Sequence, residues 1–157
     1  MNIKLIAIGK TDNKDLNSFI ETYRKRLSFY INFEFDIIPD LKKVKNLSEN
    51  QQKQKEGALI LEKIASTDFL VLLDENGKQM DSIVFSEYLQ KHLNSGIKQL
   101  VFVIGGPYGF SEDVYAKAQG KLSLSKMTFS HQMVRLFFIE QLYRGFTILK
   151  NEPYHHR

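Results

Sequence analysis

Two short and almost uninterrupted apolar runs, 68–73 (DFLVLL) and 100–104 (LVFVI), constrain the fold more than any other feature of the chain. A strand with one face in water alternates apolar and polar residues, whereas a strand covered on both faces can be apolar throughout. Strands of the second kind belong to parallel sheets that carry helices on both faces. The two runs therefore predict a mainly parallel sheet between two layers of helices.

The rest of the chain alternates between strand-like and helix-like segments, which predicts an α/β fold. At 157 residues the chain is one domain by size, spanning 1–157. The further predicted strands lie at 2–8, 33–38 and 121–125. The predicted helices lie at 15–29, from 81 or 82 to 94, in a short piece from 111, and at 131–144.

Two polar segments are expected to lie outside these elements. The lysine- and glutamine-rich stretch 41–55, with a candidate helix cap at Ser48, is expected to be a mobile connection. It leads into a helix that we expect to be buried only from 58 to 64. The segment 74–77 (DENG) is expected to be a polar turn after the first apolar run.

Composition narrows the chemistry that is available. The chain has no cysteine, which excludes a disulfide framework, a thiolate nucleophile and a zinc–thiolate site. The N-terminal apolar run is short and contains Lys4, so we interpret it as a buried strand and not as a signal peptide. No apolar stretch approaches the roughly 20 residues that a membrane helix needs. We therefore expect a cytoplasmic protein with no membrane partner.

The net charge of +4 is unevenly distributed along the chain. Up to Gly120 the basic and acidic residues cancel, so the whole excess lies in the last quarter, with three of the four histidines. A concentrated basic region is typical of proteins that bind a polyanion, because neutralising phosphates supplies most of the affinity that does not depend on sequence. The alternative is a basic end that is merely solvated.

Three glycines follow the second apolar run, in IGGPYG at 104–109. In an open parallel sheet, ligands bind outside the carboxyl ends of the strands, and three loops are candidates here. These loops follow Leu73, Ile104 and Leu124. Gly105 and Gly106 would let the backbone approach a ligand, and Gly109 would allow a left-handed turn. The spacing matches neither a P-loop nor the GxGxxG motif, and a tight turn without a ligand is the alternative.

The stretch 123–130 gathers hydroxyl groups around one methionine. Its hydroxyls and backbone amides could meet the polar edge of an adenine or a ribose, while Met127 could cover an apolar part of the ligand. Ser130 is also a suitable N-cap for the helix that follows. Both interpretations can hold together.

The helix at 131–144 is predicted to be apolar on nearly all sides. Such a helix is buried in its own protein or in a partner, and in a chain this small we expect a homodimer interface. Arg135 on this helix needs an anionic partner, either a carboxylate or a phosphate. Glu140 and Arg144 stand four residues apart and can form an ion pair.

The last five residues, 153–157 (PYHHR), combine aromatic and basic side chains. They could be disordered, or the two histidines could mark a tag remnant or a metal site. We expect no metal, because no cluster of Asp, Glu or Cys accompanies them. Tyr154 could instead stack on a base, and a histidine can exchange a proton near neutral pH.

These blocks together resemble one known family. LVFVIGGPYG, LSLSKMTFSHQMVRLFFIEQLYR and PYHHR are similar to the RlmH family of ribosomal RNA large-subunit methyltransferases, and the likeness covers essentially the whole chain. Gly145 and Phe146, where alanine and a variable residue would be expected, are a mild departure. The resemblance implies a SPOUT-type α/β domain whose C-terminal segment threads through a loop to form a trefoil knot. The rules for chain connections would not predict such a knot.

The resemblance also implies an activity and its residues. The expected protein is a homodimer that uses S-adenosylmethionine, held by the knot, to methylate N3 of a pseudouridine in helix 69 of 23S ribosomal RNA, with the assembled ribosome and not DNA as its partner. The implied cofactor-binding residues are Leu73, Gly105, Leu124, Ser125, Lys126, Met127, Thr128 and Phe129. The residues implied for catalysis are Arg144, Tyr154, His155 and His156. Those implied for RNA binding are His131, Arg135 and Arg157.

A mechanism follows as a hypothesis. His155 or His156 would remove the N3 proton, and Arg144 or Arg135 would stabilise the negative charge that develops. We expect each subunit's cofactor loop to face the partner's tail. Two other classes stay open: a non-catalytic ribosome-associated dimer that keeps the fold, and a nucleotide-binding enzyme that uses the glycine loop for phosphates. The intact motifs argue against the first, and the missing P-loop lysine and the basic tail argue against the second.

Overall fold

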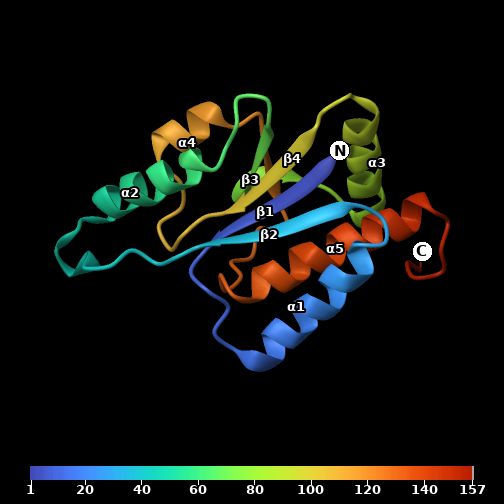
Figure 1. Ribbon diagram of the computed structural model, residues 1–157, viewed down its shortest axis with the longest axis horizontal. Coiled ribbons are helices and arrows are strands. Elements are labelled where there is room, and N and C mark those ends of the chain that lie inside the picture. Colours follow the sequence, from blue (N-terminus) through green and yellow to red (C-terminus); the bar gives the residue numbers. More distant parts are fainter. Residues whose placement is uncertain (157) are drawn as a thin grey trace.

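The computed structural model, which describes residues 1–156, shows a five-stranded parallel sheet with helices on both faces (Figure 1). The strands are β1 (Asn2–Ile8), β2 (Asn32–Ile38), β3 (Phe69–Gln79), β4 (Gln99–Ile104) and β5 (Gly120–Ser123), in the order β2-β1-β4-β3-β5. The helices are α1 (Lys14–Leu27), α2 (Glu49–Glu62), α3 (Ser82–Asn94), α4 (Glu112–Lys117) and α5 (Met133–Leu149), with a short 3-10 helix, η1, at Val44–Asn46. The predicted α/β class and parallel sheet are confirmed.

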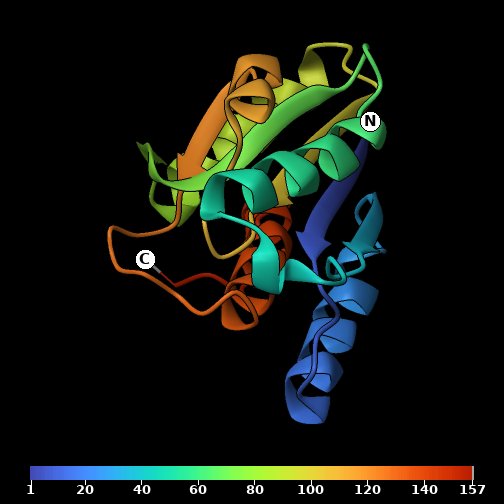
Figure 2. The same cartoon turned by 90° about the vertical axis from the view of Figure 1, so that its left-hand side faces the viewer.

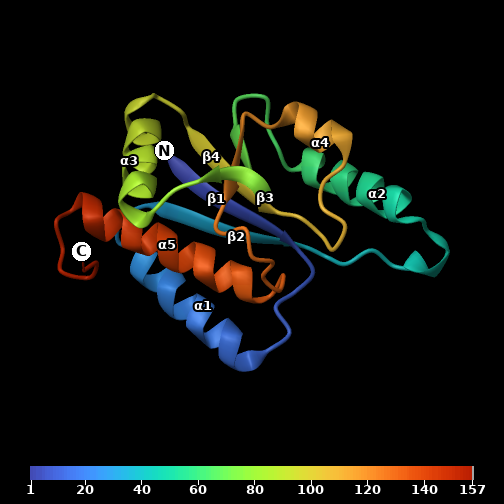
Figure 3. The same cartoon turned by 180° about the vertical axis from the view of Figure 1, so that it is seen from behind.

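The direction of each crossover decides which face its helix covers. The connections from β1 to β2 and from β3 to β4 run one way across the sheet, and their helices, α1 and α3, share one core. The connections from β2 to β3 and from β4 to β5 run the other way, and α2 and α4 share the opposite core. Right-handed crossovers require this reversal. Helix α5 then returns to the first face and lies between α1 and α3 (Figure 3).

Strand β4 shows why an apolar run need not alternate. Leu100 and Phe102 enter the larger core with α1, α3 and α5, while Val101 and Val103 enter the smaller core with α2 and α4. All four side chains are fully buried. The prediction of a strand covered on both faces is therefore confirmed.

The structure corrects several predicted boundaries. Helix α5 runs from Met133 to Leu149 and not from 131 to 144. Helix α2 begins at Glu49, because Ser48 and Gln51 form a capping box, so only the first part of 41–55 is a connection. Strand β5 ends at Ser123 and not at residue 125. Strand β3 continues to Gln79, so 74–77 is not a separate turn after the strand.

The segment 74–77 is an excursion within β3 that passes against the backbone of β5. Leu73 before it and Lys78 after it both pair with Leu122 of β5. A Cβ atom at Gly77 would lie 2.6 Å from the amide nitrogen of Leu122. Backbone atoms cannot move aside as a flexible side chain can, so only glycine fits at this crossing.

The loop from β5 to α5 leaves the sheet where the strands end, and in Figure 2 it projects from the molecule before it reaches the helix. Ser130 caps the approach to α5, since its hydroxyl accepts a hydrogen bond from the Met133 amide at 3.0 Å. The hydrogen bond of the predicted cap is therefore present, although α5 itself begins only at Met133, with Gln132 in the capping position. Across residues 1–156, the helices are too short or too polar to cross a membrane.

Candidate functional site

A cavity of about 450 Å³ opens at the carboxyl ends of β3, β4 and β5. Its volume lies in the range of small-molecule sites, about 300 to 1,000 Å³, and its position is where open parallel sheets bind ligands. The lining comes from the excursion of β3, the glycine loop after β4, the loop after β5 and the start of α5. The three loops that the sequence singled out therefore meet at one cavity.

Most of the residues predicted to bind a cofactor line this cavity. They are Leu73, Gly105, Leu124, Ser125, Met127, Thr128 and Phe129. Lys126 is exposed and does not contribute to the lining. His131, predicted to contact RNA, lies in the cavity wall instead. The structure thus brings the predicted cofactor residues together, except for Lys126.

The two adjacent glycines of the loop leave little room for a side chain beside their protein neighbours. A Cβ atom at Gly105 would lie 3.1 Å from the Phe110 ring, and one at Gly106 would lie 2.5 Å from a carboxylate oxygen of Glu56. Gly109 has φ +81°, which confirms the predicted left-handed turn. The loop is therefore shaped by contacts behind it, while its front faces the cavity.

Glu56 on α2 supports the glycine loop from behind. Its side chain is buried, and within residues 1–156 its Oε1 atom has no hydrogen-bond partner. Burial raises the pKa of Glu56, the charge of Asp40 raises it further, and a hydrogen bond from Gln52 opposes both. Sequence periodicity gave no signal for this residue.

Two carboxylates in the cavity wall, Asp74 and Glu75, belong to the excursion of β3. The Tyr115 hydroxyl on α4 donates a hydrogen bond to Asp74. Burial raises the pKa of Tyr115 to about 12, and the bond to Asp74 adds to this effect. The Thr128 hydroxyl lies 3.4 Å from Oε1 of Glu75, across the cavity mouth. The wall can therefore attract positively charged parts of a ligand. The sequence did not predict this, because 74–77 was expected to be a turn outside the site.

The hydroxyls of the loop after β5 mainly stabilise the loop itself. The Ser123 hydroxyl donates to the Ser125 carbonyl at 2.9 Å, and the Ser125 hydroxyl accepts from the Met127 amide at 3.0 Å. Met127 is 75% exposed at the edge of the cavity. Its role in covering an apolar part of a ligand stays a prediction.

Arg135 is fully buried, and its partners differ from those predicted. Its guanidinium donates to the carbonyls of His131 and Ile8 and to the Thr11 hydroxyl, at 2.9 to 3.0 Å. These are neutral oxygens, so the prediction of a directly bonded anion was wrong. Burial lowers the pKa of Arg135, while Asp40 and Asp12 raise it through their charges. Arg135 ties α5 to the end of β1 and is not accessible to RNA in this structure.

The residues predicted for catalysis form a second cluster at the other end of α5. Glu140 Oε1 accepts hydrogen bonds from Arg144 at 2.6 Å and from the Tyr154 hydroxyl at 2.9 Å. The predicted pair of Glu140 with Arg144 is therefore confirmed. Arg144 Nη1 lies 3.1 Å from Nδ1 of His155. His156 is exposed, and Arg157 lies outside the described residues.

Tyr154 is held on several sides. Its hydroxyl lies 3.3 Å from the Tyr23 hydroxyl of α1, its ring packs 4.7 Å from that of Tyr143, and the Arg144 guanidinium lies 4.7 Å from its centroid. Burial raises the pKa of Tyr154, and its bonds to Tyr23 and Glu140 raise it further. The phenol therefore stays protonated and acts as a donor. Sequence reasoning missed Tyr23, which is 131 positions away from Tyr154.

The cavity and this tail cluster do not meet within one chain. Val134 of α5 lines the cavity, and Arg144 of the tail cluster lies ten residues further along the helix, roughly 15 Å at the usual helical rise. In Figures 1 and 3 the C-terminus lies beyond the far end of α5, away from the loop that enters it. Within one chain the two clusters are therefore separate.

Most of the apolar surface of α5 is covered by its own chain. Phe138, Ile139, Leu142 and Phe146 are buried against the sheet, α1 and α3. The exposed apolar side chains of α5 are Met133 and Phe137, at about 40% each. Because the chain itself covers most of this helix, the apolar character of α5 supports a dimer less strongly than the sequence suggested.

Comparisons with known proteins agree over the full chain. A family described as "Predicted SPOUT methyltransferase" matches residues 1–155. The chain is 75% identical, over the whole length of both, to Ribosomal RNA large subunit methyltransferase H of Flavobacterium johnsoniae. It is 62% identical to the protein of that name from Parabacteroides distasonis and 51% identical to that from Bacteroides thetaiotaomicron, each over 99% of both chains.

Proposed function

Because the chain belongs to the SPOUT methyltransferase family, among the large-subunit methyltransferases H, we propose that it methylates ribosomal RNA of the large subunit with S-adenosylmethionine. The observation that carries the proposal is the cavity at the strand ends, where the residues matched to cofactor binding converge. We further propose that the methyl acceptor is N3 of a pseudouridine in helix 69 of 23S ribosomal RNA. The substrate would be the assembled ribosome, which places the protein in the cytoplasm.

The cavity suits this cofactor in size and in chemistry. Leu73, Ile104 and Leu124 give an apolar lining for an adenine, and the glycine loop offers backbone groups for its polar edge. Asp74 and Glu75 would face the positively charged amino and sulfonium groups. When bound, the cofactor supplies a methyl group on a positively charged sulfur. The chain's part is to hold the acceptor nitrogen about 3 Å from that carbon, in line with the sulfur.

The tail cluster supports distinct roles for its residues. A guanidinium can only donate, so Nδ1 of His155 must accept from Arg144, and the ring proton of a neutral His155 lies on Nε2. His155 is thus arranged to donate a hydrogen bond to a carbonyl of the base, together with Arg144. This leaves His156 as the group that removes the N3 proton, directly or through water.

Both clusters can serve one reaction in a homodimer. We propose that two α5 helices pair antiparallel about a two-fold axis, which brings each tail to the partner's cavity. Met133 and Phe137 would lie in this interface, next to Phe129, whose ring is 5.4 Å from that of Phe137. We also propose that the C-terminal segment forms a trefoil knot. Membership of the SPOUT family supports this.

Cofactor titration and methyl transfer in the same samples test the proposal. We expect calorimetry to show S-adenosylmethionine binding, and we expect label to appear at a pseudouridine in assembled ribosomes but not in free RNA. Cofactor binding without label would reopen the substrate. A folded dimer that bound ribosomes but neither cofactor nor label would favour the alternative, a non-catalytic ribosome-associated protein.

A further inference from the structure

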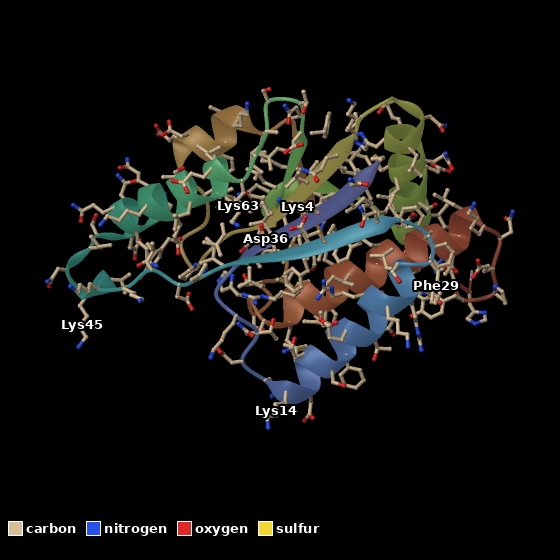
Figure 4. The ribbon with its side chains drawn as sticks, in the orientation of Figure 1. Lys4, Lys14, Phe29, Asp36, Lys45 and Lys63 are labelled. Atoms are coloured by element: carbon tan, nitrogen blue, oxygen red, sulfur yellow. The ribbon has the colours of Figure 1, made fainter. Side chains whose placement is uncertain are left out.

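A basic and aromatic surface lies beside the tail cluster and has no role in the site described above. Arg24, Lys25 and Arg26 occupy the last turn of α1, and Phe29 follows shortly after the helix ends. In Figure 4, Phe29 lies at the end of the molecule where the chain terminates, far from Lys45. Its side chain is 81% exposed, more than any other large apolar side chain that the structure describes. We call these four residues the α1-end surface.

Aromatic contacts join the α1-end surface to the tail cluster. The Arg26 guanidinium lies 5.2 Å from the Tyr23 ring centroid and 5.8 Å from that of Tyr143. Tyr23 and Tyr143 in turn contact Tyr154. The end of α1 is therefore held beside the residues to which we assign the chemistry.

Only part of the positive charge near the tail is engaged inside the protein. Arg144 is paired with Glu140, whereas Lys150 just after α5 is exposed. Of the three cations in the last turn of α1, Arg24 forms an exposed ion pair with Glu21 at 2.8 Å, which contributes little in water. Lys25 forms no ion pair within the part of the chain that the structure describes. Accessible positive charge beside the tail therefore comes from the end of α1 together with Lys150.

Ordinary structural roles explain only part of this arrangement. Basic residues in the last turn of a helix interact favourably with its dipole, and single exposed apolar residues are common. Neither role calls for an exposed ring next to three cations. Proteins hold unpaired nucleotides in this way, because the ring stacks on a base while the cations meet phosphates.

We propose that the α1-end surface binds the RNA substrate next to the catalytic tail. Phe29 stacks on an unpaired base that neighbours the target nucleotide, and Arg24 and Lys25 contact the phosphates that flank it. The inference rests on the proposed function, because that function places RNA at the tail. A second copy of the chain fits less well, since a two-fold contact would bring the same three cations face to face.

Binding of large ribosomal subunits, measured at several salt concentrations, tests the surface. Three variants are compared with the wild type. One carries both Arg24→Gln and Lys25→Gln, the second carries Phe29→Ala, and the third carries Phe29→Tyr, which keeps an aromatic ring. Lys42→Gln with Lys45→Gln, near η1 at the other end of the molecule, is the matched control for charge. Cofactor affinity and the mass of the dimer are measured for every variant.

We expect the double variant at Arg24 and Lys25 to lower the slope of log affinity against log salt by about 1 to 2, and the control to leave it unchanged. We expect Phe29→Ala to weaken binding between about fivefold and a hundredfold with little change in slope, and Phe29→Tyr to restore it. Cofactor affinity and dimer mass should not change, because these residues lie outside the cavity.

Two results would overturn the inference. The first is that Phe29→Ala binds large subunits with the affinity of the wild type and that the double variant at Arg24 and Lys25 has the same salt slope as the control variant. The other is loss of the dimer in Phe29→Ala, which would assign the surface to contact between copies. Both leave the proposed function intact if the wild type still transfers methyl groups. Conversely, a wild type that binds subunits through this surface without methyl transfer would refute the proposed function alone.

Discussion

The two ends of α5 organise their surroundings in different ways. At its start, Arg135 is buried and bonds only to neutral oxygens, two of them backbone carbonyls, and the nearby cavity is lined largely by loops. From its middle towards its far end, Glu140 accepts hydrogen bonds from the side chains of Arg144 and Tyr154. The first end fixes backbone geometry, as a small-molecule site requires. The second gathers groups that can donate protons and stabilise charge.

The largest effect is expected where β3 crosses β5 beside the cavity. In Gly77→Ala the new methyl group would meet the backbone of Leu122 at 2.6 Å, so the crossing must open or the sheet must shift. We expect a loss of at least about 3 kcal/mol in the free energy of unfolding, or no folded protein. Gly120→Ala on β5 is the control, because its Cβ would meet only Val71, at 3.9 Å. Equal urea midpoints for the two variants would contradict this account of the crossing.

Paired substitutions of the two arginines sharpen the contrast between the ends. Arg135→Met removes the three hydrogen bonds that a fully buried side chain donates, two of them to Ile8 and Thr11, and we expect it to lower the free energy of unfolding by about 2 to 4 kcal/mol. Arg144→Met breaks a partly exposed pair and should lower it by about 1 kcal/mol or less. We expect Arg144→Met nevertheless to abolish most methyl transfer while cofactor affinity stays within twofold. Urea unfolding measures both variants. If Arg135→Met and Arg144→Met lowered the free energy of unfolding equally, the described difference between the two ends of α5 would be wrong.

Mixed dimers can show whether the two ends act together across subunits. Thr128→Arg would fill the cavity from an exposed position, and Arg144→Met would disable the tail. Each variant alone should be inactive. Refolded together, they form heterodimers with one intact site each, and we expect about a quarter of wild-type transfer. No recovery, with heterodimers confirmed by mass, would place the whole site within one chain.

The smallest effect concerns the buried carboxyl behind the glycine loop. Because burial raises the pKa of Glu56, the folded protein holds this proton more tightly than the unfolded chain does. The stability it contributes is therefore fully present below the unfolded pKa and is lost as pH rises through the folded pKa. We expect Glu56→Gln to be more stable than wild type at pH 8, by up to about 1 kcal/mol, and not at pH 4. Thermal unfolding at both pH values measures this, and a gain of equal size at both would exclude proton linkage.

The sequence was informative where a local pattern decides the structure. The apolar runs of β3 and β4 predicted strands covered on both faces, and the glycines after Ile104 identified a loop at the cavity. It was less informative where distant residues meet. The bond from Arg135 to Thr11 joins residues 124 positions apart, and nothing in the local pattern of α5 indicates it.

The excursion at 74–77 shows the same limit at shorter range. Polar residues after a buried strand are usually a turn, and only the passage of β5 beside Gly77 makes them part of the cavity wall. The hydrogen bonds of the tail cluster were likewise not predictable from local sequence, because Tyr23 of α1, near the other end of the chain, contacts the Tyr154 hydroxyl.

The ring contacts around the tail also give the protein an optical property. The chain has seven tyrosines and no tryptophan, so its ultraviolet emission comes from tyrosine alone. Four of the seven, Tyr23, Tyr30, Tyr143 and Tyr154, lie in one connected group of rings where the tail meets α1. An event that lifts the tail from α1 changes the surroundings of this group. The native fluorescence of the unlabelled protein therefore reports on the seating of the tail.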